Sequence, residues 1–200
     1  TVNGPNQSKS SSGKTSHCLI PLGGQVFFLV FLSLLVSLFN PAQVSARTLY
    51  GKVLKVFDGD TILVRVQGQE EHVRLREIDA PEITHRKKAG QEPWGRRARD
   101  FARSLVEKKT IRMDLEERDE RDKYHRLLAY VFLNHTFVNR EMIRSGNAFF
   151  YPGTYRGERA AELQAAEEVA RGKGLGVWDK KRGLMERPHD FRARTQRDES

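Results

Sequence analysis

The sequence predicts an α+β fold, a five-stranded β-barrel with three helices. Five short segments have the alternating or continuously apolar pattern of strands, and three others carry apolar residues at helical spacing. One of these helices falls between the third and fourth strands. Hydrophobic residues are 38% and charged residues 30% of the 200, which is the composition of a globular protein.

The first three strands form a continuous stretch of chain. Residues 49–57 have a strand pattern, Asp58-Gly59 is a turn signal, and residues 61–66 alternate apolar and polar side chains. Residues 67–70 form a hairpin turn, and residues 72–78 return as the third strand. We therefore expect a hairpin with one apolar face and one polar face.

The later elements carry equally clear signals at their ends. Pro93 suits the first turn of a helix, and Gly146 is placed to end one. The predicted elements are strands at residues 111–115 and 127–133 and helices at residues 94–106, 138–143 and 160–170. Five strands with a helix inserted after the third fit a small barrel of the OB type.

We divide the chain into three segments. Residues 1–46 are a signal peptide or an N-terminal membrane anchor, residues 47–178 the folded domain, and residues 179–200 a charged, flexible tail. The first segment has no Asp or Glu, an uncharged apolar run at Val26–Phe39, and small residues up to Ala46. That run is shorter than the roughly 20 residues of a membrane span, which favours the signal peptide. We expect a secreted or periplasmic protein, membrane-anchored if the segment is not cleaved.

Composition narrows the classes of function. The single cysteine, Cys18, excludes a disulfide scaffold and a cysteine-based zinc site. The formal net charge is +9, which indicates a polyanionic partner such as a nucleic acid or an anionic membrane surface.

Two aspartates stand out at the open end of the predicted hairpin. If the turn is centred on Gly68 and Gln69, Asp60 and Asp79 lie within a residue or so of facing each other. Two adjacent carboxylates repel unless a cation lies between them, and oxygen ligands select a hard cation such as Ca²⁺ or Mg²⁺. The alternative is that one aspartate only belongs to a turn and the other to a strand exit. Taken together, they favour a metal site.

Two arginines and a glutamate extend this group. Arg74 lies on the strand that leads to Asp79, and Arg126 precedes the buried fifth strand. A cation and two guanidinium groups at one point suit phosphoryl transfer, where charge on the phosphate oxygens must be stabilised. Glu82 follows Asp79 closely and is placed to orient or deprotonate the attacking water. The alternative for each arginine is a solvated surface charge.

These residues lie in motifs that resemble those of the staphylococcal nuclease family, also called thermonucleases, and of its secreted bacterial members. The matching segments are DGDT at 58–61, RLREIDAPE at 74–82, DKYHRLLAY at 122–130, and residues 138–146. The resemblance covers about residues 49–178 and implies the five-stranded barrel with three helices. It also implies a calcium-dependent phosphodiesterase that hydrolyses DNA and RNA and leaves 3′-phosphate ends.

The resemblance assigns a role to each residue of the group. It implies that Asp60 and Asp79 bind Ca²⁺ through their carboxylates and Ala80 through its backbone carbonyl. Glu82 matches the general base of the family. Arg74 and Arg126 match its phosphate-binding arginines.

Further residues form a candidate nucleic-acid surface. Lys87 and Lys88 lie in a basic loop that would guide the substrate backbone electrostatically, unless it is simply a solvated loop. Lys123 and Tyr124 lie shortly before Arg126 in the sequence and belong to the same candidate surface, where Tyr124 would contact a terminal phosphate or base. The resemblance places Tyr151 and Tyr155 where the family stacks nucleotides, although packing within the protein is an equal alternative for both.

Three hypotheses of function follow. The first is a metal-dependent nuclease with DNA and RNA as substrates, acting as a monomer without an obligate protein partner. The second is a catalytically silent nucleic-acid-binding module on the same barrel, which would not need the full set of acidic and basic residues. The third, a basic protein of the membrane surface, does not explain the acidic cluster at the hairpin end.

Overall fold

The computed structural model describes residues 47–84, 90–116, 121–154 and 156–198. The predicted signal peptide or anchor lies outside these residues, as do the predicted contacts of Lys87, Lys88 and Tyr155. None of the described helices combines the length and the apolar character needed to cross a membrane.

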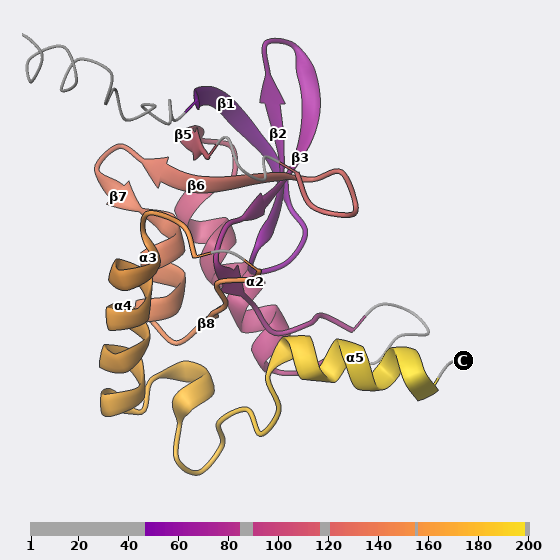
Figure 1. The fold of residues 1–200 in the computed structure, drawn as a ribbon, viewed down its shortest axis with the longest axis vertical. Helices are drawn as coiled ribbons and strands as arrows, with labels where there is room; N and C mark the ends of the chain where they lie inside the picture. Colours follow the sequence, from indigo (N-terminus) through magenta and orange to yellow (C-terminus); the bar gives the residue numbers. More distant parts are fainter. Residues whose placement is uncertain (1–46, 85–89, 117–120, 155, 199–200) are drawn as a thin grey trace, which may run out of the picture. The chain divides into compact units, whose positions relative to one another are not determined.

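Five strands close into a barrel (Figure 1). Antiparallel pairs run in the order β3-β2-β1-β5-β6, and β3 pairs in parallel with β6, so the sheet closes on itself. The barrel strands are β1 (Arg47–Val56), β2 (Thr61–Val66), β3 (Gln69–Leu75), β5 (Thr110–Leu115) and β6 (Leu127–Leu133). A short strand, β7 (Thr136–Phe137), extends the edge of β6. The predicted α+β fold with a five-stranded barrel is confirmed.

The apolar face of the hairpin fills the barrel. Ile62, Val64 and Val73 are at most 1% exposed, whereas the neighbouring Arg65 and His72 are exposed. Full burial of such a side chain stabilises the fold by about 1.5–3 kcal/mol. The strands that carry the acidic and basic residues are therefore held by a closed core.

Three helices occupy the predicted positions: α2 (Trp94–Val106), α3 (Val138–Arg144) and α4 (Ala160–Lys173). Gly146 follows α3 as expected, with a φ of 73° that favours glycine. A Cβ atom at Gly146 would also lie 2.1 Å from the carbonyl oxygen of Leu175, so this position needs glycine for space as well.

The segment after residue 178 differs from the predicted flexible tail. A 3₁₀ turn, η1 (Gly176–Trp178), leads to a fourth helix, α5 (Pro188–Asp198). The connecting segment is held because Leu184 packs with Trp94 and Phe149, and because the Trp94 indole N–H donates a 3.2 Å hydrogen bond to a backbone carbonyl of this segment. Residues beyond 178 therefore contribute to the folded part of the chain.

The third strand ends earlier than predicted. β3 stops at Leu75 because the backbone reverses at Glu77, whose φ is 59°. The Tyr130 hydroxyl donates a 2.7 Å hydrogen bond to the Glu77 carboxylate and holds this uncommon conformation. The next residues form a separate strand, β4 (Ile78–Asp79), which pairs with β8 (Phe149–Phe150) outside the barrel sheet.

Candidate active site

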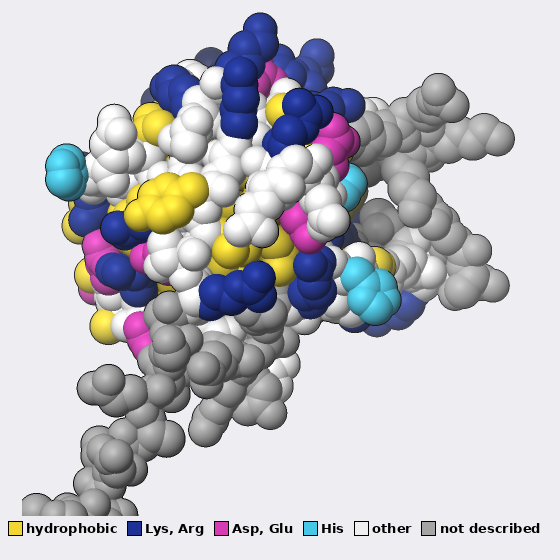
Figure 2. Space-filling view, turned by 90° about the horizontal axis from the view of Figure 1, so that it is seen from above, with side chains coloured by type: hydrophobic (Ala, Val, Ile, Leu, Met, Phe, Trp, Pro, Cys, Tyr) yellow, Lys and Arg dark blue, Asp and Glu magenta, His cyan; other side chains and the backbone are white. Residues whose placement is uncertain are grey.

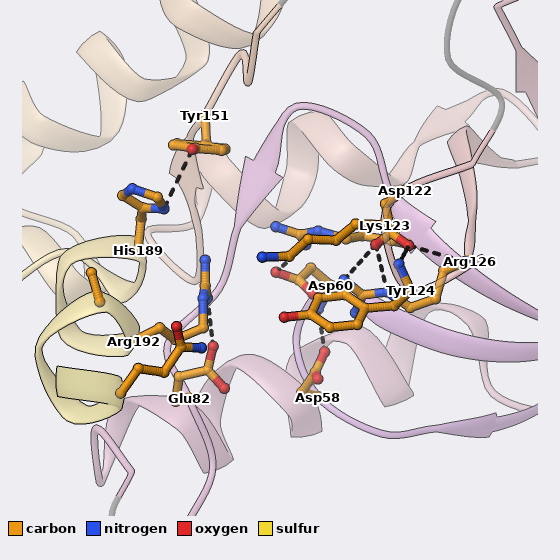
Figure 3. Close-up of a pocket in the computed structure, with 13 residues that line it drawn as sticks. Asp58, Asp60, Glu82, Asp122, Lys123, Tyr124, Arg126, Tyr151, His189 and Arg192 are labelled. Carbon is orange, nitrogen blue, oxygen red and sulfur yellow. Dashed lines mark hydrogen bonds and ion pairs between the residues drawn. The ribbon is translucent and has the colours of Figure 1, made fainter. Parts of the chain in front are cut away.

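A cleft of about 420 Å³ opens between one end of the barrel, the turn before β6, and α5 (Figure 3). Its lining combines acidic, basic and aromatic side chains from all three parts. They are Asp58, Asp60, Arg74, Glu82, Asp122, Lys123, Tyr124, Arg126, Tyr151, His189, Arg192, Ala193 and Gln196. The cleft thus collects Asp60, Arg74, Glu82 and Arg126, four of the residues that the sequence predicts for the site.

Arg74 joins the two predicted metal ligands. Its Nη1 lies 2.6 Å from Asp60 Oδ2, and its Nη2 lies 3.2 Å from Asp79 Oδ1. Asp60 also accepts hydrogen bonds of 2.9 Å from the backbone N–H of Ala80 and from the hydroxyl of Thr61. Both aspartates are buried, so these contacts replace the water that each carboxylate loses.

The two aspartates meet by a different route from the predicted one. The hairpin turns at Gln67-Gly68, one residue earlier than expected, and Leu75 donates its N–H to the Asp60 carbonyl at 2.8 Å. The prediction that hairpin register brings Asp60 and Asp79 face to face is therefore wrong. The reversal of the backbone at Glu77 instead carries Asp79 back to the guanidinium that already holds Asp60.

Burial sets the electrostatics of these carboxyl groups. Burial disfavours the charged form of Asp60, but the Arg74 guanidinium and the Ala80 N–H outweigh it and hold the pKa of Asp60 below its ordinary value. Burial, followed by the Asp60 charge, raises the pKa of Asp79. The same two causes raise the pKa of Asp58 to about 7. Burial and the Asp60 charge therefore disfavour the charged forms of Asp58 and Asp79, whereas Arg74 favours the charged form of Asp60.

Arg126 faces the same cleft from the turn before β6. Its Nη1 donates a 3.1 Å hydrogen bond to the Thr61 hydroxyl, and its Nη2 lies 2.7 Å from Asp122 Oδ2. Asp122 also accepts the backbone N–H groups of Tyr124 and Arg126, which shapes the turn. His125, at the tip, has a φ of 63°, in the left-handed region that glycine prefers.

Glu82 lies on the opposite side of the cleft from Arg126 (Figure 3). Its backbone carbonyl accepts the Gln91 N–H at 2.8 Å, and a Cβ on Gly95 would lie 2.2 Å from the same oxygen. The loop is therefore fixed closely against the start of α2. The Glu82 side chain is 32% exposed and reaches toward α5.

The predicted aromatic and basic contacts have distinct surroundings. Lys123 and Tyr124 line the cleft; Tyr124 is 60% exposed, and the Arg126 guanidinium lies 5.4 Å from the centre of its ring. Tyr151 also lines the cleft and stacks on His189 with ring centres 5.1 Å apart. Lys and Arg side chains are more widespread than Asp and Glu on the face in Figure 2, in keeping with the basic composition.

The sequence analysis missed the residues of α5 that line the cleft. Arg192 makes ion pairs with Asp79 Oδ1 at 2.9 Å and Glu82 Oε1 at 2.5 Å. The overlooked signal was Pro188 at the first position of a helix with Asp190 in its first turn. High charge in the segment obscured it.

The donor chemistry of the cleft fits a hard cation such as Ca²⁺. Four carboxyl groups line the cleft, those of Asp58, Asp60, Glu82 and Asp122, and carboxylate oxygens are the ligands that such a cation prefers. Within the described ranges, no group of three or more His, Cys, Asp and Glu side chains has metal-binding geometry. Instead, the carboxylates form ion pairs with Arg74 and Arg192.

Comparison with known proteins identifies the family. Residues 72–180 match the family model described as staphylococcal nuclease homologue. The chain belongs to the staphylococcal nuclease family. It is 34% identical over 132 residues to a thermonuclease of Staphylococcus intermedius, covering 64% of this chain and 75% of that protein. The resemblance of the motifs to the staphylococcal nuclease family is confirmed.

Two further proteins match over a similar part of the chain. An uncharacterised protein of Bacillus anthracis is 37% identical over 136 residues, which are 66% of this chain and 62% of that protein. A probable endonuclease of Botryotinia fuckeliana is 35% identical over 131 residues, which are 62% of this chain and 48% of that protein. The family match ends at residue 180, before α5 begins.

Proposed function

We propose that this protein is a calcium-dependent nuclease that hydrolyses DNA and RNA with little sequence specificity and leaves 3′-phosphate ends. Membership of the staphylococcal nuclease family and similarity to a thermonuclease and a probable endonuclease support it. The observation that carries it is the convergence of Arg74, Arg126 and Glu82 on one cleft with the Asp60 carboxylate. A binding module would not need this combination of groups.

In the proposed reaction, the phosphodiester binds between the two sides of the cleft. Arg74 and Arg126 donate hydrogen bonds to its oxygens and stabilise the negative charge that grows during attack. Glu82 orients the attacking water and accepts its proton. The water oxygen bonds to phosphorus, the bond from phosphorus to the 5′ oxygen breaks, and that oxygen takes up a proton.

Asp60 and Asp79, with the Ala80 carbonyl, are the proposed calcium ligands. Bound calcium would supply positive charge next to the phosphate and lower the pKa of water. The two carboxylates would hold this charge in place, and the ion pairs of Arg74 with both would keep them oriented.

The proposed substrate path uses the basic and aromatic side chains. Lys123 contributes a backbone contact without sequence preference, and Tyr124 and Tyr151 offer faces for stacking bases. Lys87, Lys88 and Tyr155 complete this proposal from outside the described residues. We further propose that the protein acts as a secreted or periplasmic monomer.

A nuclease assay on the full chain tests this function. We expect digestion of single-stranded DNA and of RNA with added Ca²⁺, no digestion in excess chelator, and recovery when Ca²⁺ is restored. Phosphatase treatment should change the electrophoretic mobility of the products through the loss of 3′-phosphates. Binding of DNA without cleavage under all conditions would instead support the silent module.

A further inference from the structure

Arg192 is the group in the cleft to which neither the motifs nor the family match assigns a role. It lies on α5, beyond the residues that the family model matches. Its guanidinium group makes one ion pair with Asp79 and another with Glu82, so it spans a proposed metal ligand and the proposed base. Figure 3 shows it beside Glu82, across the cleft from Asp60 and Arg126.

The orientation of the Glu82 side chain depends on its contact with Arg192. Among the described residues, Arg192 is the group that hydrogen-bonds the Glu82 carboxylate, at 2.5 Å. The backbone of the loop is fixed by Gln91, but a glutamate side chain can still adopt several rotamers from a fixed backbone. A charge-assisted hydrogen bond to one of its oxygens selects one orientation.

The position of Arg192 is itself well supported. On the N-terminal side of α5, the Gln91 side chain donates a 2.8 Å hydrogen bond to the Glu186 carbonyl. Within α5, His189 stacks on Tyr151 and lies 3.3 Å from its hydroxyl. Contacts at two separate points therefore fix the helix that carries Arg192.

Arg192 and a divalent cation can both find partners in the cleft. Arg192 pairs with one oxygen of each carboxylate, Asp79 Oδ1 and Glu82 Oε1. Each carboxylate has a second oxygen, so the ion pairs with Arg192 leave both groups able to accept a further partner such as a cation or a water molecule.

We propose that Arg192 is a positioning residue of the nuclease reaction: its guanidinium fixes the Glu82 carboxylate relative to Asp79, so that Glu82 faces the attacking water. The inference rests on the proposed function and extends it beyond the family motifs. It assigns the helix after the matched domain a part in the reaction. Arg192 acts through Glu82 and does not need to contact the substrate.

The test compares three variants of the full chain: Arg192→Ala, Arg192→Lys and Arg194→Ala. Arg194 is the matched control, because it lies on the same helix and pairs with Glu186 and Asp198, outside the cleft. We expect Arg192→Ala to lower kcat by about 10- to 100-fold, the loss typical of a misplaced reacting group, with a smaller change in KM. Arg192→Lys should recover part of kcat, and Arg194→Ala should match the wild type.

Calcium binding, measured by calorimetry, distinguishes a role in positioning Glu82 from a role in holding the metal site together. The direction of the change in kcat distinguishes positioning from inhibition by α5. Arg192→Ala should bind Ca²⁺ at least as tightly as the wild type, because a neighbouring positive charge has been removed. Binding weakened by more than about tenfold would overturn the proposal in favour of a disrupted metal site. An unchanged or increased kcat would also overturn it, and an increase would make α5 an inhibitory segment. An inactive wild type would overturn the proposed function, and the inference with it.

Discussion

The barrel wall of the cleft, which carries Arg74, and the α5 wall, which carries Arg192, differ in how deeply their arginines are buried. The Arg74 side chain is 14% exposed and holds two buried aspartates from within β3. The Arg192 side chain is 33% exposed, and α5 has one buried residue, Pro188. Charges of the barrel wall are therefore part of the folded core, whereas α5 is held mainly by polar surface contacts. Substitutions in the first wall should affect stability and activity together, and those in the second should affect activity alone.

Arg74→Ala should have the largest effect and tests the barrel side of this comparison. It leaves Asp60 and Asp79 buried without their shared partner, which should lower the free energy of unfolding by about 3–5 kcal/mol. Urea unfolding measures this change. Arg65→Ala is the control, since Arg65 lies on the adjacent strand and pairs with Glu70 at the surface. Equal stability of the two variants would contradict a core role for Arg74.

Glu82→Gln should separate activity from stability. The side chain is partly exposed, so the fold should be retained, while kcat should fall by at least about a hundredfold through loss of the proposed base. Rates on single-stranded DNA at saturating Ca²⁺ measure the loss, and circular dichroism checks the fold. A variant with near wild-type kcat would remove Glu82 from the proposed reaction.

Asp122→Asn tests the turn that carries Arg126, with an intermediate effect. Burial alone would raise the pKa of Asp122. The hydrogen bond and the charge of Arg126 outweigh burial and hold this pKa below its ordinary value of 3.8. Its stabilising contribution is therefore present above pH 3.8 and is lost as the pH falls through the lowered folded-state pKa. We expect a loss of about 1 kcal/mol at pH 7 that disappears in acid. A difference independent of pH would show that the ion pair does not cause it.

Removal of residues 188–200 should have the smallest effect on stability. Because α5 has one buried residue, Pro188, and the buried Asp79 keeps its ion pair with Arg74, the free energy of unfolding should fall by only about 1 kcal/mol. Activity should fall as in Arg192→Ala. A large drop in the unfolding midpoint would show instead that α5 belongs to the core.

The barrel was predictable because burial on one face leaves a period of two in the strands, as at Ile62 and Val64. The convergence of the acidic and basic groups was also predictable from the motifs, but the register was not. The residues around Glu77 in the sequence do not indicate its left-handed backbone conformation. The Tyr130 hydroxyl, which stabilises this conformation, comes from a strand far along the chain. The α5 helix was missed because its charge resembles that of a disordered tail.

Local patterns and motifs predicted the order of the elements, the basic character and the set of reactive side chains. These properties depend on residues that are neighbours along the chain. The pairing of Asp79 with the guanidinium that holds Asp60, and the approach of Arg192 to Glu82, depend on contacts between residues distant in sequence. Such contacts form only when the closed barrel and the anchored segment after η1 fix both partners in space. For that reason the membership of the site could be read from the sequence, while its geometry required the folded chain.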